Sequence, residues 1–212
     1  MSYTTIYEYA TDSFTEKKSE FIWHICPVKT QEEAVRFIEY IKGQHRKARH
    51  NVYAYVLRDG NASRYSDDGE PQGTGGVPVL DVINKAGLTD VCVVVTRYFG
   101  GTLLGTGGLV RSYTQAARAA MEDAETVRMC LCRKLAVTVE YGALDRLLYE
   151  LRRREIEMGE TEYGAKVTLH LTVEEESADA LQDTITALTS GGAVIGTETK
   201  GFFPISRKSE QR

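Results

Sequence analysis

Apolar residues recur along roughly the first 130 positions with the spacing of alternating strands and helices. Strands are predicted near Thr5–Tyr9 and Glu20–Cys26, and again at 52–57 and 91–96. The last of these, VCVVVT, does not alternate between apolar and polar positions, which is typical of a strand buried on both faces. The polar segment TDSFTEKKS is predicted to connect the first two strands.

Three amphipathic helices are predicted among these strands. The first begins at Thr30, where Glu33 completes a capping box, and its inner face holds Ala34, Val35, Ile38 and Ile41. The second runs from about Pro78 to Gly87, with proline near its first turn and glycine at its end. The third reaches about Glu125, and its apolar face holds Leu109, Tyr113, Ala116, Ala117 and Ala120.

The pattern changes character near Met129. From there the sequence predicts a strand at 134–140, a leucine-rich helix, a hairpin turning at Tyr163–Gly164, a helix ending at Gly191–Gly192, and a final strand within 193–205. A strand–helix–strand–strand–helix–strand order is typical of the ferredoxin-like sandwich. We therefore predict an α+β protein with two domains, residues 1–130 and 131–212.

Charge narrows the classes of ligand. The 212 residues include 26 Lys and Arg against 30 Asp and Glu, giving a net charge of −4, and both halves share this balance. A broad basic surface that coats nucleic acid is therefore not expected, and any phosphate binding must be local. The sequence shows no secretory signal, no apolar run of about 20 residues and no CxxC pair, so we expect a cytoplasmic protein with reduced cysteines and no membrane partner.

Two glycine-rich stretches, SRYSDDGEPQGTGGVP at 63–78 and TRYFGGTLLGTGGLVRSY at 96–113, each precede a predicted helix. Backbone N–H groups at a helix N-terminus favour phosphate or carboxylate. Arg97 and Arg111 lie near the two ends of the second stretch, where the helix dipole disfavours a cation. Either they pair with Asp67, Asp68 or Glu70 and join the two loops, or they bind a phosphate. The sequence leaves both interpretations open.

Other chemistry is weakly indicated. Thr106 stands where a Walker loop needs lysine, although the loop loosely resembles the phosphate loop of galactokinase-type and homoserine-kinase-type enzymes. The first loop's carboxylates could hold Mg²⁺, but an Asp-Asp-Gly sequence is more often a turn and a cap. We find no catalytic constellation, and therefore predict no catalytic residues, no metal site and no cofactor.

The basic segment HRKARHN at 45–51 supplies further cations close to these loops. With the arginines and tyrosines of the second stretch it could form a basic, aromatic patch suited to RNA. The residues predicted to bind ligand or nucleic acid are Arg46, Lys47, Arg49, Ser66, Asp67, Asp68, Glu70, Gly73, Thr74, Gly75, Thr96, Arg97, Tyr98, Gly100, Gly101, Gly105, Gly107, Gly108, Arg111 and Tyr113.

Three stretches, RHNVYAYVL, YSDDGEPQGTGGVPVL and VVVTRYFGGTLLGTGGLVRSY, resemble the signature of the IMPACT/YigZ family over about residues 15–120. The resemblance implies that the first domain has the left-handed βαβ fold shared by a small-subunit ribosomal protein and the fourth domain of elongation factor G. It also implies a second domain like the last domain of elongation factor G, as in bacterial members. Family members are associated with translational control, and bacterial ones with nucleic-acid binding.

These observations favour a non-enzymatic RNA-binding or ribosome-binding protein linked to translational regulation, which binds through a face made of the two glycine loops. One alternative is an enzyme that binds a nucleotide or a phosphorylated metabolite with those loops. Another is a protein-interaction module whose partner is a translation-linked protein.

Overall fold

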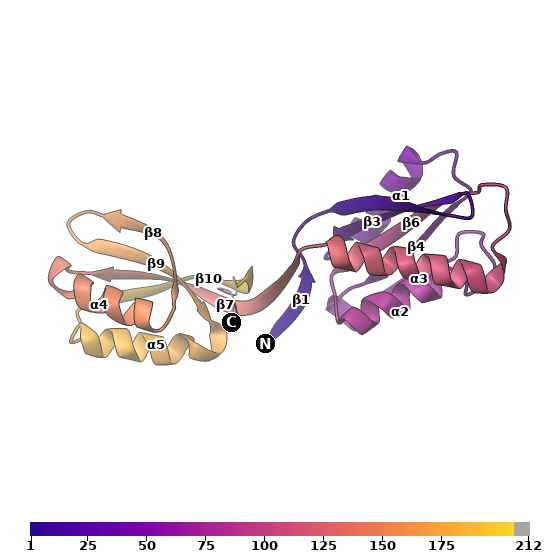
Figure 1. Ribbon diagram of the computed structural model, residues 1–212. Helices are drawn as coiled ribbons and strands as arrows, with labels where there is room; N and C mark the ends of the chain where they lie inside the picture. Colours follow the sequence, from indigo (N-terminus) through magenta and orange to yellow (C-terminus); the bar gives the residue numbers. More distant parts are fainter. Residues whose placement is uncertain (206–212) are drawn as a thin grey trace. The chain divides into compact units, whose positions relative to one another are not determined.

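The computed structural model describes residues 1–205 and divides into two compact units, which we describe separately. The first unit is Tyr3–Arg128, and the second is Met1–Ser2 together with the chain from Met129 onward. Within the described residues there are five α-helices and two five-stranded sheets (Figure 1). The predicted α+β class is confirmed.

The sheet of the first unit is built around one central strand. Strand β6 (Val91–Tyr98) pairs antiparallel with β3 (Ser19–Pro27) on one side and with β4 (His50–Val56) on the other. Because both neighbours are antiparallel to β6, they are parallel to each other, and helix α1 (Gln31–Gln44) joins them in a βαβ unit. The edge strands are β2 (Ala10–Glu16), beside β3, and β5 (Ser63–Ser66), beside β4.

Helices cover both faces of this sheet (Figure 1). Val91, Val93 and Val95 of β6 belong to one apolar cluster, with α2 (Gly76–Ala86) and α3 (Gly105–Asp123). Cys92 and Val94 alternate with them and belong to a second cluster, under α1. All five side chains are fully buried, so β6 is covered on both faces as predicted.

Four local predictions were wrong. The segment predicted as a polar connection is strand β2, whose turn into β3 has Lys17 and Lys18 at positive φ. Strand β1 is Ser2–Ile6 instead of Thr5–Tyr9, and β5 lies within the predicted first loop. Val35 is 45% exposed instead of facing inward. Edge strands and helix borders carry weak apolar patterns because solvent covers one side.

The second unit is a ferredoxin-like sandwich, as predicted. Its four main strands lie in the order β10 (Val194–Pro204), β7 (Thr126–Val139), β9 (Val167–Glu174) and β8 (Glu157–Tyr163), all antiparallel. Helices α4 (Tyr141–Arg153) and α5 (Glu175–Leu188) contribute Leu147, Leu151, Leu181 and Ile185 to a core shared with β7 and β9.

The cysteines are all free, and Cys92, Cys130 and Cys132 are buried. None of the helices within residues 1–205 combines the length and the hydrophobicity that a membrane span requires.

The second unit has its own apolar core, so we expect it to fold alone. A fragment of residues 129–212 should give a dispersed amide NMR spectrum and unfold cooperatively in urea. A spectrum typical of an unfolded chain would show that the two parts depend on each other for folding, and would contradict the predicted domain division.

Buried His24 predicts a loss of stability in acid. Its side chain is 5% exposed, its Nδ1 contacts the Tyr9 hydroxyl at 2.9 Å, and its Nε2 has no partner among the described residues. Burial, followed by the charge of nearby His45, lowers the pKa of His24 to about 4. The unfolded chain therefore binds this proton first, and stability should fall as the pH drops from 6.5 towards 4, by on the order of 2–3 kcal/mol.

Urea unfolding monitored by the single tryptophan, Trp23, which is 2% exposed in β3, reports this change for the first unit. The His24→Gln variant should show a flatter pH dependence over the same interval. An unchanged dependence in the variant would assign the acid sensitivity to other groups.

Candidate functional site

The first glycine loop, residues 66–76, is organised around the Asp67 carboxylate. Backbone N–H groups of Gly75 and Gly76 donate to Asp67 Oδ1 at 2.9 and 2.8 Å, and that of Gly73 donates to Oδ2 at 2.8 Å. Gly75 is the N-cap residue of α2 and has no side chain to cap the helix. The anion site at this helix N-terminus is therefore filled by the protein's own carboxylate.

Electrostatics keeps Asp67 ionised. Burial by itself would raise the pKa of its carboxyl, but the hydrogen bonds from Gly73, Gly76 and Gly75 outweigh burial, and the pKa lies below its usual value. The amides of the first loop are thus already matched with a negative charge.

The close approach of the first loop to strand β5 explains why glycine stands at position 76. A Cβ built there would lie 2.8 Å from Tyr65 Cδ2 and 2.9 Å from the carbonyl carbon of Ser66. A larger residue would push the start of α2 away from β5, so this glycine is structural.

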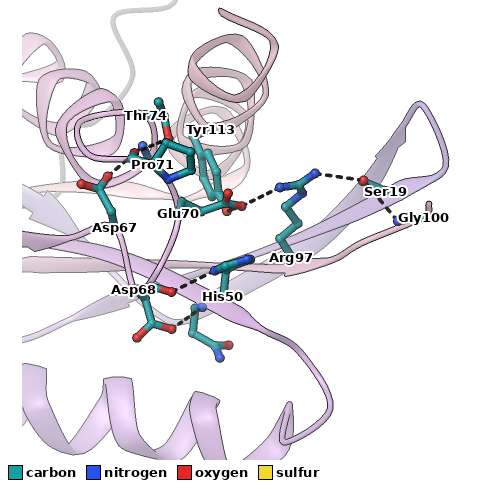
Figure 2. Close-up of polar contacts among 12 residues, drawn as sticks. Ser19, His50, Asp67, Asp68, Glu70, Pro71, Thr74, Arg97, Gly100 and Tyr113 are labelled. Carbon is teal, nitrogen blue, oxygen red and sulfur yellow. Dashed lines mark hydrogen bonds and ion pairs between the residues drawn. The ribbon is translucent and has the colours of Figure 1, made fainter. Parts of the chain in front are cut away.

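Asp68 fastens the same loop to the neighbouring elements. Its carboxylate accepts from the Asn51 backbone N–H at 2.7 Å and pairs with Lys42 Nζ at 3.1 Å, which joins the loop to β4 and α1. His50 Nδ1 donates to the Asp68 carbonyl at 2.9 Å (Figure 2). Asp68 therefore serves as an anchor for the loop.

Glu70 and Arg97 form the buried centre of the site (Figure 2). Arg97 Nη1 donates to Glu70 Oε1 at 2.7 Å, and the Tyr113 hydroxyl donates to the same oxygen at 2.9 Å. Burial and then the Glu70 carboxylate raise the pKa of Tyr113 well above its usual value, so the phenol keeps the proton that it donates. Arg97 is only 6% exposed, so its charge is paired inside the protein.

Arg97 also reaches the second glycine loop, residues 99–105. Its Nη2 donates to Ser19 Oγ at 3.3 Å, and the Gly100 backbone N–H donates to the same oxygen at 3.3 Å (Figure 2). For Arg97, the pairing interpretation of the sequence thus describes what the structure contains. The two loops are joined through Glu70, Arg97 and Ser19.

Arg111 behaves differently. Its side chain is exposed in the first turns of α3, and it makes no ion pair with the described carboxylates. A Cβ built on Gly107 would lie 3.7 Å from Arg111 Nη1, so the guanidinium folds back over the first turn of its own helix. No described side chain caps α3, whose N-cap residue is Leu104. The N-terminus of α3 therefore combines uncapped amides with an unpaired cation, which favours a bound anion.

A pocket of about 460 Å³ lies between the two loops. Its lining comes from the start of β4, the first loop, the end of β6, the second loop and the first turn of α3. The residues are Arg49, His50, Gly69, Glu70, Pro71, Arg97, Phe99, Leu103, Leu104, Gly105, Thr106 and Leu109.

The structure brings together only some of the residues predicted to bind ligand. Arg49, Glu70, Arg97 and Gly105 line the pocket. Gly107, Gly108 and Arg111 lie in the first turns of α3 but do not line it, and Arg111 lines a separate pocket with Gln115 and Arg118. Arg46 and Lys47 are exposed but do not line the pocket between the loops. Several others have structural contacts instead. The Ser66 hydroxyl accepts from the Asp68 N–H, and Tyr98 bonds to His45. The buried members of this group are Thr74, Gly75, Thr96 and Tyr113. Gly100 and Gly101 belong to the second loop, and Gly73 and Asp67 to the first.

Sequence analysis missed the apolar wall of the pocket. Phe99 is 48% exposed and Leu103 is 83% exposed, although both are large and apolar. Their position next to the glycines of the second stretch was the available signal, because exposed apolar residues on a constrained loop often bind a ligand.

Within residues 1–205, no three His, Cys, Asp or Glu side chains are arranged to hold a metal ion. The three carboxylates of the first loop that were considered for Mg²⁺ are each engaged by protein donors.

Comparison with known proteins covers both units. The Impact N-terminal domain matches residues 17–121, and a domain of unknown function, DUF1949, matches residues 137–191. The chain is 39% identical to IMPACT family member YvyE of Bacillus subtilis, over 92% of this chain and 90% of that protein. It is 34% identical to IMPACT family member YigZ of Escherichia coli, over 74% and 78% of the two chains. A crystal structure titled only as a hypothetical protein shares 29% identity with a TM-score of 0.62, covering 92% of this chain and 96% of its own.

The role of Asp67 as an internal cap can be tested by Asp67→Asn. In the variant, the side-chain NH₂ group replaces one of the two carboxylate oxygens and therefore faces a backbone N–H with no acceptor between them. The free energy of unfolding should fall by about 1–3 kcal/mol. The difference should persist above pH 3.8 and shrink as the pH falls below it, because the native carboxyl has the lower pKa. Asp81→Asn, an exposed position on α2, is the matched control and should change little. Equal stability of the two variants would contradict the capping role.

Proposed function

The chain belongs to the IMPACT family, and on that premise we propose that it is a non-enzymatic RNA-binding or ribosome-binding protein that takes part in translational regulation in the cytoplasm. The observation that carries this proposal is the uncapped N-terminus of α3 beside the exposed guanidinium of Arg111. A phosphate there would accept from backbone N–H groups and pair with a cation at once.

The contrast between the two glycine loops also supports the start of α3 as the phosphate-binding surface. At α2 the amides are already matched with Asp67, whereas at α3 they face solvent without a cap. Arg97 is neutralised by Glu70 and lies too deep to reach a phosphate on the surface. The phosphate-binding groups of the proposal are therefore Arg111, Arg49 on the pocket wall, and the first turn of α3.

The small number of cations sets the expected strength of binding. Two exposed arginines and one helix N-terminus contact about three phosphates, and the net charge of −4 adds no general attraction. Arg46 and Lys47 precede Arg49 on the exposed segment after α1 and would extend the contact along a strand. Affinity for RNA should be modest and sensitive to salt.

A binding role also suits the state of the acidic groups. The carboxylates of the first loop that could serve as general acid or base are held by structural donors: Asp67 by three backbone amides, Asp68 by Asn51 and Lys42, and Glu70 by Arg97 and Tyr113. Moving a proton onto any of them would break the contacts that fix the loop. The protein therefore uses this face to bind.

Arg111→Ala tests the phosphate contact. In fluorescence anisotropy with a labelled short oligoadenylate RNA, log affinity for the wild type should fall with log salt at a slope of about −2, as expected for roughly three neutralised phosphates on a single strand. The variant should bind more weakly and flatten that slope by about 0.7. Its free energy of unfolding should change by less than about 0.5 kcal/mol, since the side chain is exposed.

Arg36→Ala is the matched control. Arg36 is an exposed arginine on α1, which covers the opposite face of the sheet, so its removal should leave the slope unchanged. If Arg111→Ala and Arg36→Ala bind alike with the wild-type slope, the start of α3 is not the phosphate site and the proposal fails.

A further inference from the structure

We propose that the pocket between the two glycine loops receives one unstacked nucleobase of the bound strand, which stacks on the exposed side of Phe99. This inference rests on the proposed function, because the neighbouring phosphate is taken to lie at the start of α3. It adds the class of group that the pocket recognises: a planar base.

Phe99 is the outer member of a stack that begins in the core. The Arg97 guanidinium carbon lies 5.5 Å from the centre of the Phe21 ring and 5.6 Å from the centre of the Phe99 ring. Phe21 is fully buried, whereas Phe99 is 48% exposed and lines the pocket. A planar aromatic group entering the pocket would extend this alternating stack by one member.

The platform is held in place before any ligand arrives. Glu70 and Ser19 fix the Arg97 guanidinium, and Ser19 also accepts from the Gly100 N–H, directly after Phe99. A Cβ on Gly100 would collide with the Lys18 carbonyl, so the loop is seated against the turn between β2 and β3. Ligands bind more tightly to such preformed surfaces, because less conformational entropy is lost.

The other walls are apolar and open to solvent. Leu103 is 83% exposed, and Leu104, Leu109 and Pro71 complete the apolar lining. A volume of about 460 Å³ is at the lower end of small-molecule sites and suits a single nucleotide unit better than a stacked pair. Single-stranded RNA offers such a unit, since its bases can leave the stack and settle on protein aromatic rings.

Charge selects an anionic ligand over a neutral side chain of a peptide. Glu70 is the only carboxylate among the described residues of the lining, and it is paired with Arg97. Arg49 and the uncapped backbone N–H groups of Gly105 and Thr106 are therefore available to bind an anionic group of a ligand. Arg97 itself is nine-tenths buried in the pocket wall, and its Nε–H has no acceptor among the described residues. A base with a phosphate attached matches both the apolar and the cationic parts of the lining.

The experiment uses the full chain and a short oligoadenylate RNA that carries one 2-aminopurine. Fluorescence of 2-aminopurine rises when the base leaves its neighbours, so binding to the wild type should raise it. In Phe99→Ala, affinity should fall about tenfold or more, as expected for one lost stacking contact, and the fluorescence rise should disappear. Phe99→Trp should restore the affinity, because a larger aromatic ring still stacks. Tyr40→Ala is the matched control, as Tyr40 is a 60% exposed aromatic residue on α1 that does not line the pocket.

The outcomes separate this inference from the proposed function. Salt-dependent binding that is weakened by Arg111→Ala but unaffected by Phe99→Ala would keep the RNA-binding function and overturn the base pocket. Absence of salt-dependent RNA binding by the wild type would overturn both. Adenosine 5′-monophosphate distinguishes the source of the base: if it displaces the RNA and saturates the wild type but not Phe99→Ala, the pocket binds free nucleotides as well as strands.

Discussion

Arg97 carries a charge into the interior of the first unit, and a buried charge is tolerated only with a partner of opposite sign and further hydrogen bonds. Glu70 supplies the charge, Tyr113 donates to the same carboxylate oxygen, and Ser19 occupies a second arginine nitrogen. These four residues come from β6, the first loop, α3 and the start of β3. Removing either charge would leave the other unpaired and buried, so the geometry of both loops depends on this ion pair.

From that centre the two glycine loops take different roles. The first loop turns its amides inward onto Asp67, and its glycines allow close contact with β5. The second loop is held at Gly100 through Ser19 but leaves the N-terminus of α3 uncapped, with Arg111 folded over its first turn. Similar stretches of sequence thus produce one helix N-terminus that is matched by the protein's own carboxylate and one that is uncapped. Phe99, in the second loop, packs against the same buried arginine, whose guanidinium carbon lies 5.6 Å from the centre of its ring.

The sequence predicted those parts whose patterns are periodic. Strand β6, the three helices of the first unit and the order of the ferredoxin-like elements follow from apolar spacing, whereas edge strands β2 and β5 have too few buried positions to produce a pattern. The sequence could not separate Arg97 from Arg111, because both flank the same glycine stretch. The alternation of side chains along β6 shows why Arg97 is buried. Arg97 lies on the same face of the strand as Val93 and Val95, which is the face covered by α2 and α3. Tyr98 lies on the other face with Val94, where it bonds to His45 on the α1 side of the sheet. The alternation could be seen in the sequence, but the sequence did not show which helices cover each face of the strand.

The central claim is that the open anion site lies at the start of α3 and not at the first glycine loop. An amide NMR titration of the full chain with short oligoadenylate RNA tests it most directly, since every backbone N–H in question reports separately. The account predicts that the largest shifts fall at Phe99, Thr106, Gly107 and Arg111, while Gly73, Gly75 and Gly76 stay unchanged because Asp67 holds their hydrogen bonds. Shifts centred on Gly73, Gly75 and Gly76, with Thr106 and Gly107 unmoved, would contradict it.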